Sequence, residues 1–300
     1  GGNHSDRVTV SLSANRPGEI YYTLDSSSPL DSLSRISYST PIIIAGPNQR
    51  NLKSVAIDQT GLASEVRSDT YSFSMTIPIV SPPATSLAAN AAVTASNIPT
   101  NTSWSAQTFG GRTITSYRLE RSINGGAFAQ VPLATPTTNN QRILLTAGRN
   151  YEYRVSAVDS GGLGSIVTRG GVFNLAALQE AAGAITYRGT WLRTVATNFF
   201  GGSARSTTAR NASATVRFTG SQVAWITAVG PTMGIASVTL DGVAQGNVDL
   251  YSRTNTGAVL KFVRTGLPRA VHTLVITATG TRNAASTGNR VDLDAVAIVN

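Results

Sequence analysis

Short apolar runs alternate with polar turn residues along nearly the whole chain. Arg7–Ser13, Tyr151–Val158 and Ser213–Thr219 are examples, and Gly, Asn, Asp or Pro separates runs of this kind. Successive side chains of a strand point to opposite faces, so this alternation predicts half-buried strands joined by tight turns. One short helix is predicted around Ala176–Ala182. As a whole, the pattern predicts an all-β protein built from β-sandwiches.

A proline-rich stretch marks the first expected domain boundary. Ile77–Pro83, with the sequence IPIVSPP, is expected to be a semi-extended linker. Three hundred residues suffice for two or three domains of roughly 100–150 residues each. We therefore predict three β-sandwich domains in series, at residues 1–76, 77–175 and 176–300.

Two segments of the first domain carry a family resemblance. Ile20–Pro29 (IYYTLDSSSP) and Leu52–Ser64 (LKSVAIDQTGLAS) are each a strand followed by a polar turn. Together they resemble the immunoglobulin-like domain at the C-terminus of chitobiase and β-hexosaminidase-type proteins, over about residues 6–76. The resemblance implies an accessory immunoglobulin-like module of a secreted, polysaccharide-active or surface protein, with no active site of its own.

The second domain resembles a fibronectin type III domain over residues 84–175. Thr102–Ser105 fits an early strand with a core tryptophan, and Thr113–Gly126 fits the next strand and its hairpin turn. Thr146–Asp159 fits the late strand. The resemblance implies a second immunoglobulin-like sandwich that acts as a spacer. It also implies that the hydroxyl of Tyr151 binds backbone just upstream, as in a tyrosine corner.

The third domain resembles the jelly rolls of the galactose-binding-like superfamily, as found in carbohydrate-binding modules. Tyr187–Trp191 (YRGTW), Val248–Tyr251 (VDLY) and Val291–Ala295 (VDLDA) are among the motifs that carry this resemblance. Such domains are often appended to bacterial glycoside hydrolases, proteases and surface proteins. Many of them, though not all, bind carbohydrate.

Composition and charge narrow the function classes. Only 13% of the residues are charged, about half the usual ~25%, which is typical of exported β-proteins with neutral, polar surfaces. The absence of cysteine excludes disulfides and thiolate metal sites. No run of 18 apolar residues is present, so no membrane-spanning helix is predicted. We expect an extracellular or cell-surface location, in a bacterium.

The net charge of +9 is spread unevenly. Residues 176–300 contain eleven Lys or Arg against five Asp or Glu, whereas residues 1–76 contain six against seven. The arginines stand singly between Thr, Ser and Ala, so no nucleic-acid interface is predicted. Gly1–Ser5 shows no secretion signal, and we expect it to be a tag remnant or an internal cut in a longer or processed chain.

Catalytic chemistry is not supported by the sequence. The two histidines are His4, in the leader, and His272, which is expected to be a partly exposed structural residue at a turn. No G-x-S-x-G motif occurs. Asp292 and Asp294 alternate on one face of the last strand, but Val296 continues that face towards the core. We therefore predict no catalytic residues, and strand-end aspartates that bind backbone N–H groups.

A bound calcium ion is the one metal site that we consider for the third domain. Some carbohydrate-binding jelly rolls hold a structural calcium, and calcium needs six to eight oxygen ligands. The aspartates of this domain are Asp241, Asp249, Asp292 and Asp294, which are scattered along the sequence. We assign no metal ligand and no cofactor, with a structural calcium as the alternative.

A sugar site is the sharper hypothesis for the third domain. Sugar rings stack on aromatic side chains, while their hydroxyls need planar polar partners. The candidate ligand-binding residues are Phe199, Phe200, Tyr251, Arg253 and Asn255. In a strand the two adjacent phenylalanines would point opposite ways, which would leave one facing solvent.

Core packing is the competing interpretation for the aromatic residues of this domain. We assign Trp225 to the core because it lies inside an alternating apolar run, and Trp191 as well. For Tyr251 and Phe199, binding and core packing both stay open.

These features favour a non-catalytic extracellular binding or adhesion segment. The third domain would recognise polysaccharide or a cell-surface polymer, with the first two domains as spacers. One alternative is a structural subunit of a bacterial cell-surface layer, filament or fibre, in which the same faces contact copies of the chain or neighbouring surface proteins. The other is the accessory C-terminal region of an exported hydrolase.

Overall fold

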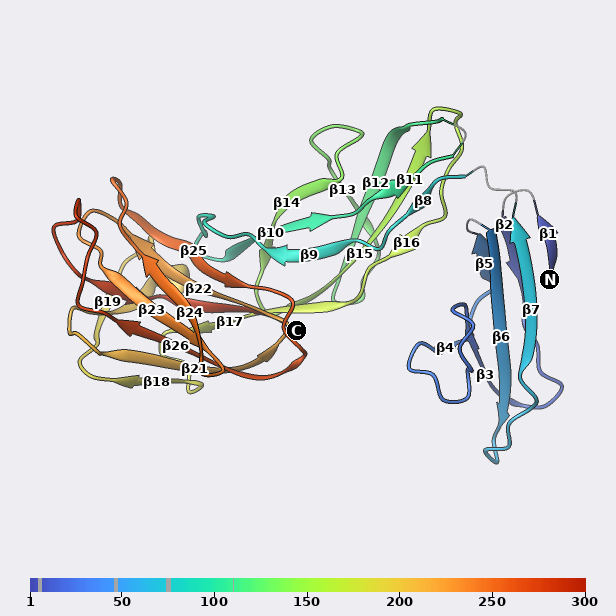
Figure 1. Cartoon of the computed structure of the whole chain (residues 1–300), viewed down its shortest axis with the longest axis horizontal. Helices are drawn as coiled ribbons and strands as arrows, with labels where there is room; N and C mark the ends of the chain where they lie inside the picture. Colours follow the sequence, from blue (N-terminus) through green and yellow to red (C-terminus); the bar gives the residue numbers. More distant parts are fainter. Residues whose placement is uncertain (5–6, 46–47, 74–76, 110) are drawn as a thin grey trace.

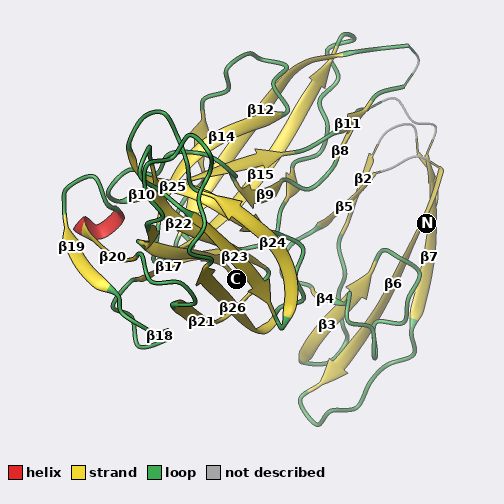
Figure 2. Cartoon of the chain, turned by 60° about the vertical axis from the view of Figure 1, so that its left-hand side comes forward, coloured by secondary structure: helices red, strands yellow, loops and turns green. Residues whose placement is uncertain are grey.

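The computed structural model describes residues 1–4, 7–45, 48–73, 77–109 and 111–300. In this part of the chain the regular elements are β-strands, together with one 3-10 turn at Phe200–Gly202. Figure 2 shows this turn in red among yellow strands. The predicted all-β fold class is therefore confirmed.

The N-terminal module is a sandwich of a five-stranded and a two-stranded sheet (Figure 1). The larger sheet has the order β1-β7-β6-β3-β4, and β2 pairs with β5 in the smaller one. Ile42, Ile44, Leu52, Tyr71 and Phe73 fill the space between them. The strands are β1 (Gly2–His4), β2 (Arg7–Val10), β3 (Gly18–Thr23), β4 (Ile36–Ser37), β5 (Ile42–Ala45), β6 (Asn48–Asp58) and β7 (Arg67–Phe73).

The second module contains the two fibronectin-like features that the sequence predicts. Trp104 is buried and packs edge-on against Tyr117, with 5.7 Å between ring centroids. The Tyr151 hydroxyl donates to the Thr146 carbonyl oxygen at 2.8 Å and accepts from the Thr146 N–H at 3.0 Å. The strands are β8 (Ile79–Val80), β9 (Ala84–Leu87), β10 (Asn97–Ser103), β11 (Ala106–Gln107), β12 (Ile114–Ile123), β13 (Ala129–Val131), β14 (Asn140–Thr146), β15 (Arg149–Asp159) and β16 (Thr168–Arg169).

Part of the expected linker belongs to this second module. Ile79–Val80 forms β8, which pairs with Ala106–Gln107 of β11. Ile77 and Val80 are both buried, and Val80 lies in the core of the module. The prolines on either side leave this short edge strand intact because Pro is tolerated at sheet edges.

The C-terminal module is a jelly-roll-like sandwich. Its five-stranded sheet has the order β18-β21-β26-β23-β24, and β28-β22-β25 lie in the facing sheet. Trp225, fully buried, packs between these layers. The strands are β17 (Phe173–Gln179), β18 (Ile185–Arg188), β19 (Leu192–Val195), β20 (Ser203–Thr207), β21 (Ser213–Gly220), β22 (Gln222–Val229), β23 (Ile235–Leu240), β24 (Val243–Asp249), β25 (Thr256–Arg264), β26 (Ala270–Ala278), β27 (Val291–Leu293) and β28 (Ala295–Val299).

The prediction of a short helix around 176–182 is wrong, because strand β17 occupies most of this segment. It pairs with β15 on one side and with β28 on the other, so it joins the second and third modules into one eight-stranded sheet. Leu175 and Ala177 pack into one core, whereas Ala176 and Leu178 pack into the other. A strand between two cores is apolar on both faces, and such a run cannot be told from a helix by periodicity.

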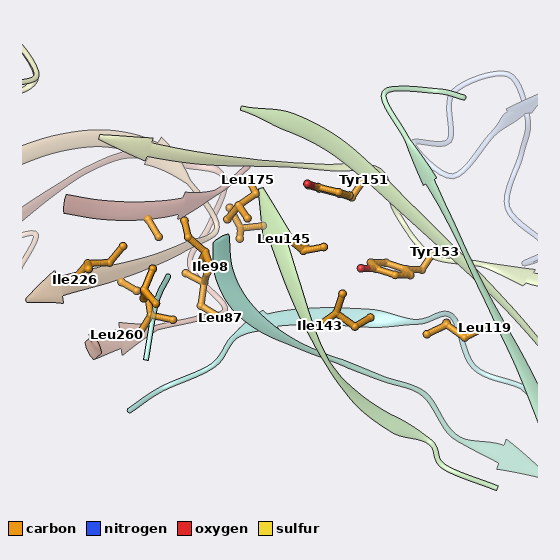
Figure 3. Close-up of a cluster of buried hydrophobic side chains, with 14 of the residues drawn as sticks. Leu87, Ile98, Leu119, Ile143, Leu145, Tyr151, Tyr153, Leu175, Ile226 and Leu260 are labelled. Atoms are coloured by element: carbon orange, nitrogen blue, oxygen red, sulfur yellow. The ribbon is translucent and has the colours of Figure 1, made fainter. Parts of the chain in front are cut away.

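The second and third modules share a hydrophobic core (Figure 3). Leu87, Ile98 and Leu145 of the second module lie in the same cluster as Ile226 and Leu260 of the third. Backbone hydrogen bonds reinforce this contact, with lengths of 2.7 Å from Asn90 N–H to Leu260 O, 3.0 Å from Leu260 N–H to Ala91 O, and 2.9 Å from Val93 N–H to Ala258 O. The contact therefore covers the outer face of the β28-β22-β25 sheet.

Candidate functional site

Three loops of the C-terminal module meet around Gly230. Gly230 forms a parallel bridge with Tyr251, and Met233 forms one with Arg290. The Ser252 N–H donates to Gly230 O at 3.2 Å. The loops that begin at 230, 250 and 281 thus form one surface, which we call the Tyr251 loop cluster. Figure 1 shows the third module at the opposite end of the molecule from the N-terminal module.

Asp249 fixes the conformation of this cluster. One carboxylate oxygen accepts from the Tyr251 N–H at 2.9 Å, and the other accepts from the Asn283 side-chain amide at 2.6 Å. A carboxylate that binds the backbone two residues ahead is a common way to hold a turn. The Asp249 side chain therefore sets the bend after β24, and the polar residues that follow this bend, Arg253 and Asn255, are exposed.

Three of the five predicted site residues lie together in this cluster. Tyr251 is half-buried, and Arg253 and Asn255 are exposed. The Asn255 amide oxygen lies directly over Gly230, where an added Cβ atom would come within 2.2 Å of it. Glycine at this position thus lets the Asn255 side chain pack across the loop. The loop thus carries an aromatic side chain, a guanidinium and an amide at alternate positions of the sequence, which are the kinds of group that bind sugar rings and their hydroxyls.

Phe199 and Phe200 do not face solvent, contrary to the expectation that one of them would. They are 5% and 4% exposed, and Phe200 lies in the core shared by the second and third modules. The pair is not in a strand, because the chain turns sharply through Gly201 and Gly202, both with positive φ. Only glycine adopts this conformation easily.

The two tryptophans and His272 have structural surroundings. Trp191 and Trp225 are buried, and the Trp225 ring N–H donates to Asp292 O at 3.0 Å. His272 is buried rather than partly exposed, and its ring nitrogens lie 2.7 Å from an Asp241 carboxylate oxygen and 2.8 Å from Pro268 O. Hydrogen bonding to Pro268 O, and then to Asp241, raises the pKa of His272.

Three of the four aspartates considered for calcium bind other side chains, and the fourth, Asp294, accepts one hydrogen bond from the Phe200 N–H. Asp241 binds His272, Asp249 binds Asn283, and Asp292 accepts two hydrogen bonds from Arg290 at 2.7 and 2.8 Å. Across the described ranges, no group of three or more His, Cys, Asp or Glu side chains could hold a metal ion. Calcium needs six to eight oxygen ligands, and this donor set does not fit it.

Asp294 forms a pair with an acidic residue that the sequence analysis missed. The pairing of Gln179 with Ala295 places Glu180 opposite Asp294 at the end of the β17–β28 ladder. Both carboxyl groups are buried. Burial, together with the charges of Glu180 and Asp292, raises the pKa of Asp294 to about 8, although the Phe200 N–H opposes this shift. Glu180 was overlooked because it lay inside the predicted helix.

Comparisons with known proteins bear chiefly on the first module. Residues 1–68 match the family described as the chitobiase/beta-hexosaminidase C-terminal domain, which confirms the resemblance for this part of the chain. No curated protein matches the sequence. In the described part of the chain, no helix has the length and apolar character needed to cross a membrane.

Solved structures give only distant similarities. The CBM36-1 domain of a multidomain xylanase from the hindgut metagenome of Trinervitermes trinervoides is 14% identical, with 42% of this chain and 97% of that one covered and a TM-score of 0.27. Fibronectin(III)-like modules of Clostridium thermocellum CbhA are 17% identical, with 56% and 84% covered and a TM-score of 0.19. An exo-beta-1,3-galactanase from Phanerochaete chrysosporium is 13% identical, with 95% and 68% covered and a TM-score of 0.31. At these scores the similarities support no argument about function.

Proposed function

We propose that the chain is a non-catalytic extracellular or cell-surface binding segment that recognises polysaccharide at the Tyr251 loop cluster. The carrying observation is that Asp249 holds the bend at Tyr251, which is half-buried, and that Arg253 and Asn255, which follow in the same loop, are exposed. The other two aromatic residues among the five candidates, Phe199 and Phe200, are buried. The first two modules act as spacers in this proposal.

The covered sheet face supports this location. In the C-terminal module, the outer face of β28-β22-β25 packs against the second module, so Ala224, Ile226 and Leu260 are buried there. A polymer therefore has no access to that face. The loop cluster instead carries the half-buried Tyr251, with the exposed Arg253 and Asn255 two and four residues further along the chain.

A glycan array with the full chain tests the proposal. We expect binding by the wild-type chain that Tyr251→Ala abolishes and that Arg269→Ala leaves unchanged, since Arg269 is an exposed arginine on a different turn. Equal binding by the wild type and Tyr251→Ala, or no glycan signal from the wild type, contradicts it. The match of residues 1–68 to an accessory domain also suits a parent protein that is an exported hydrolase.

Strand β19 favours a second candidate, self-association in a surface layer or fibre. β19 is the edge of the sheet β19-β20-β27, and all four of its residues are exposed, including Leu192 and Val195 at 66% and 69%. An exposed apolar edge strand is a template for pairing with another chain. Sedimentation of the chain over a range of concentrations distinguishes the two functions, because only the second requires oligomers that Leu192→Lys dissolves.

A further inference from the structure

Three buried acids of the C-terminal module lie close together, and two of them have an arginine partner among the described residues. We call Glu180, Asp292 and Asp294 the acid cluster. Arg193 binds Glu180 at 3.0 Å, and Arg290 binds Asp292 at 2.7 and 2.8 Å. Asp294 has no such partner. The Phe200 N–H donates to its Oδ2 at 2.9 Å, and its Oδ1 is buried with no hydrogen-bond partner among the described residues.

In the described part of the chain, no positively charged side chain forms an ion pair with Asp294. Glu180 follows β17, Arg193 lies on β19 and Arg205 on β20, and the ladder register brings Glu180 opposite Asp294. The Arg205 guanidinium lies over the Tyr187 ring at 4.9 Å. Tyr187 itself donates to Glu180 O at 2.6 Å. Since two facing buried carboxyls cannot both be ionised at low cost, Asp294 needs a proton or a cation.

A divalent cation suits this site poorly. The Glu180 Oε1 atom already accepts from Arg193 at 3.0 Å and from the Ser203 hydroxyl at 2.7 Å. A guanidinium keeps its positive charge at every accessible pH, so it repels a metal ion held by the same carboxylate. A proton on Asp294 removes the repulsion from Glu180 without any further ligand.

The loop that contacts Asp294 also contacts the second module. Phe200 binds Asp294 through its N–H, while its ring lies in the shared core. The neighbouring Gly201 N–H donates to Ala95 O of the second module at 3.1 Å. Residues 199–202, which we call the clasp loop, thus link the acid cluster to the contact between modules.

We propose that one proton on Asp294, in place of a metal ion, balances the acid cluster, and that loss of this proton loosens the clasp loop from the second module. The direction of the pH effect follows from proton binding. The folded chain holds this proton up to a pH of about 8, whereas an unfolded aspartate releases it near pH ~4. The folded state therefore binds more protons between these values, and its stability falls as the pH rises through this window.

Thermal unfolding of the full chain between pH 5 and pH 9 is the first test. Asp294→Asn keeps the shape and the oxygen acceptor of the neutral acid but cannot ionise. We expect the Tm of the wild type to fall by several degrees more than that of Asp294→Asn over this range. Asp31→Asn, a change at an exposed aspartate, should follow the wild type. Millimolar calcium or EDTA should shift no Tm. A Tm of the wild type that rises with calcium, or identical pH profiles of the wild type and Asp294→Asn, overturns the proposal.

Hydrogen–deuterium exchange at pH 9 is the second test and reads the clasp loop directly. Peptides that contain Phe200 and Gly201 should exchange faster in the wild type than in Asp294→Asn at the same pH. Equal exchange overturns the coupling to the loop.

If Asp294→Asn does not fold, Arg193→Gln replaces it. Without the guanidinium, Glu180 is unbalanced as well, so the Tm should fall more steeply with pH than in the wild type. The proposal is contradicted if the Tm of Arg193→Gln falls with pH no more steeply than that of the wild type, or if Arg193→Gln is more stable than the wild type at pH 9 without calcium.

Discussion

The side-chain amide of Gln222 is hydrogen-bonded to the backbone of Leu87, a residue of the preceding module. Gln222 Oε1 accepts from the Leu87 N–H at 3.0 Å, and Gln222 Nε2 donates to Thr85 O at 2.7 Å. The amide thus closes the free edge of β9 as another strand would. Together with β17 and the shared core, it makes residues 77–300 one continuous structure.

Replacement of Gln222 is expected to destabilise both modules together. Gln222→Ala leaves the Leu87 N–H and the Thr85 carbonyl without partners, which costs about 1–3 kcal/mol. Urea denaturation of the full chain measures this loss. Gln245→Ala is the matched control, because among the described residues the Gln245 amide bonds to Val243 O alone, on a largely exposed strand. If both variants lose the same small amount of stability, the Gln222 contact is not important.

The hydroxyl of Tyr151 is expected to stabilise the second module. Tyr151→Phe removes both bonds to Thr146, and we predict a loss of about 1–3 kcal/mol because the backbone groups are left unpaired. Tyr117→Phe serves as the control, since the structure shows no hydrogen bond from its hydroxyl to the described residues. Both are measured by denaturation of the full chain, and equal stabilities would show that the tyrosine corner contributes nothing.

Phe200 is expected to contribute to stability. Truncation of a phenylalanine in a packed core costs about 3–5 kcal/mol, so Phe200→Ala should strongly lower the Tm. Tyr251→Ala, at a half-buried position, should cost much less. Circular dichroism melting curves compare them. A Phe200→Ala chain that melts like the wild type would indicate that its ring is not in the shared core.

His272 is expected to titrate above its ordinary pKa of ~6.5. Pro268 O and Asp241 both favour the protonated ring. The resulting stability is fully present below the unfolded pKa and is lost as the pH rises through the higher folded pKa. NMR titration of the ring should give a pKa above 6.5 in the wild type and a lower value in Asp241→Asn. An identical pKa in both proteins rules out the contribution of Asp241.

Local patterns predicted the features that depend on local chemistry. The alternation around Trp225 indicated a core position. The bond from the Tyr151 hydroxyl to backbone five residues upstream was implied by the resemblance to a fibronectin type III domain, and the structure shows it. Tyr251 and Asn255 lie in one loop because they are close in sequence.

Two of the errors, at Phe200 and in the segment that contains Glu180, have a different physical cause, which is contact between modules. Phe200 looked like a surface residue because the core around it includes Ile98 and Leu145, which lie more than fifty residues earlier in the chain. Glu180 directly follows β17, a strand that is apolar on both faces, so the hydrophobic pattern did not distinguish a helix from a strand there. No local pattern reports that a sheet continues from one module into the next.

The affinity of the Tyr251 loop cluster for polysaccharide is the most direct test of the central claim. Isothermal titration with a glycan selected on the array compares the wild type, Tyr251→Ala and Arg269→Ala, all as full chains. Loss of a central aromatic contact costs about 2 kcal/mol or more, so the affinity of Tyr251→Ala should be at least ~30-fold lower, while that of Arg269→Ala stays unchanged. Equal affinities of Tyr251→Ala and the wild type would contradict the account.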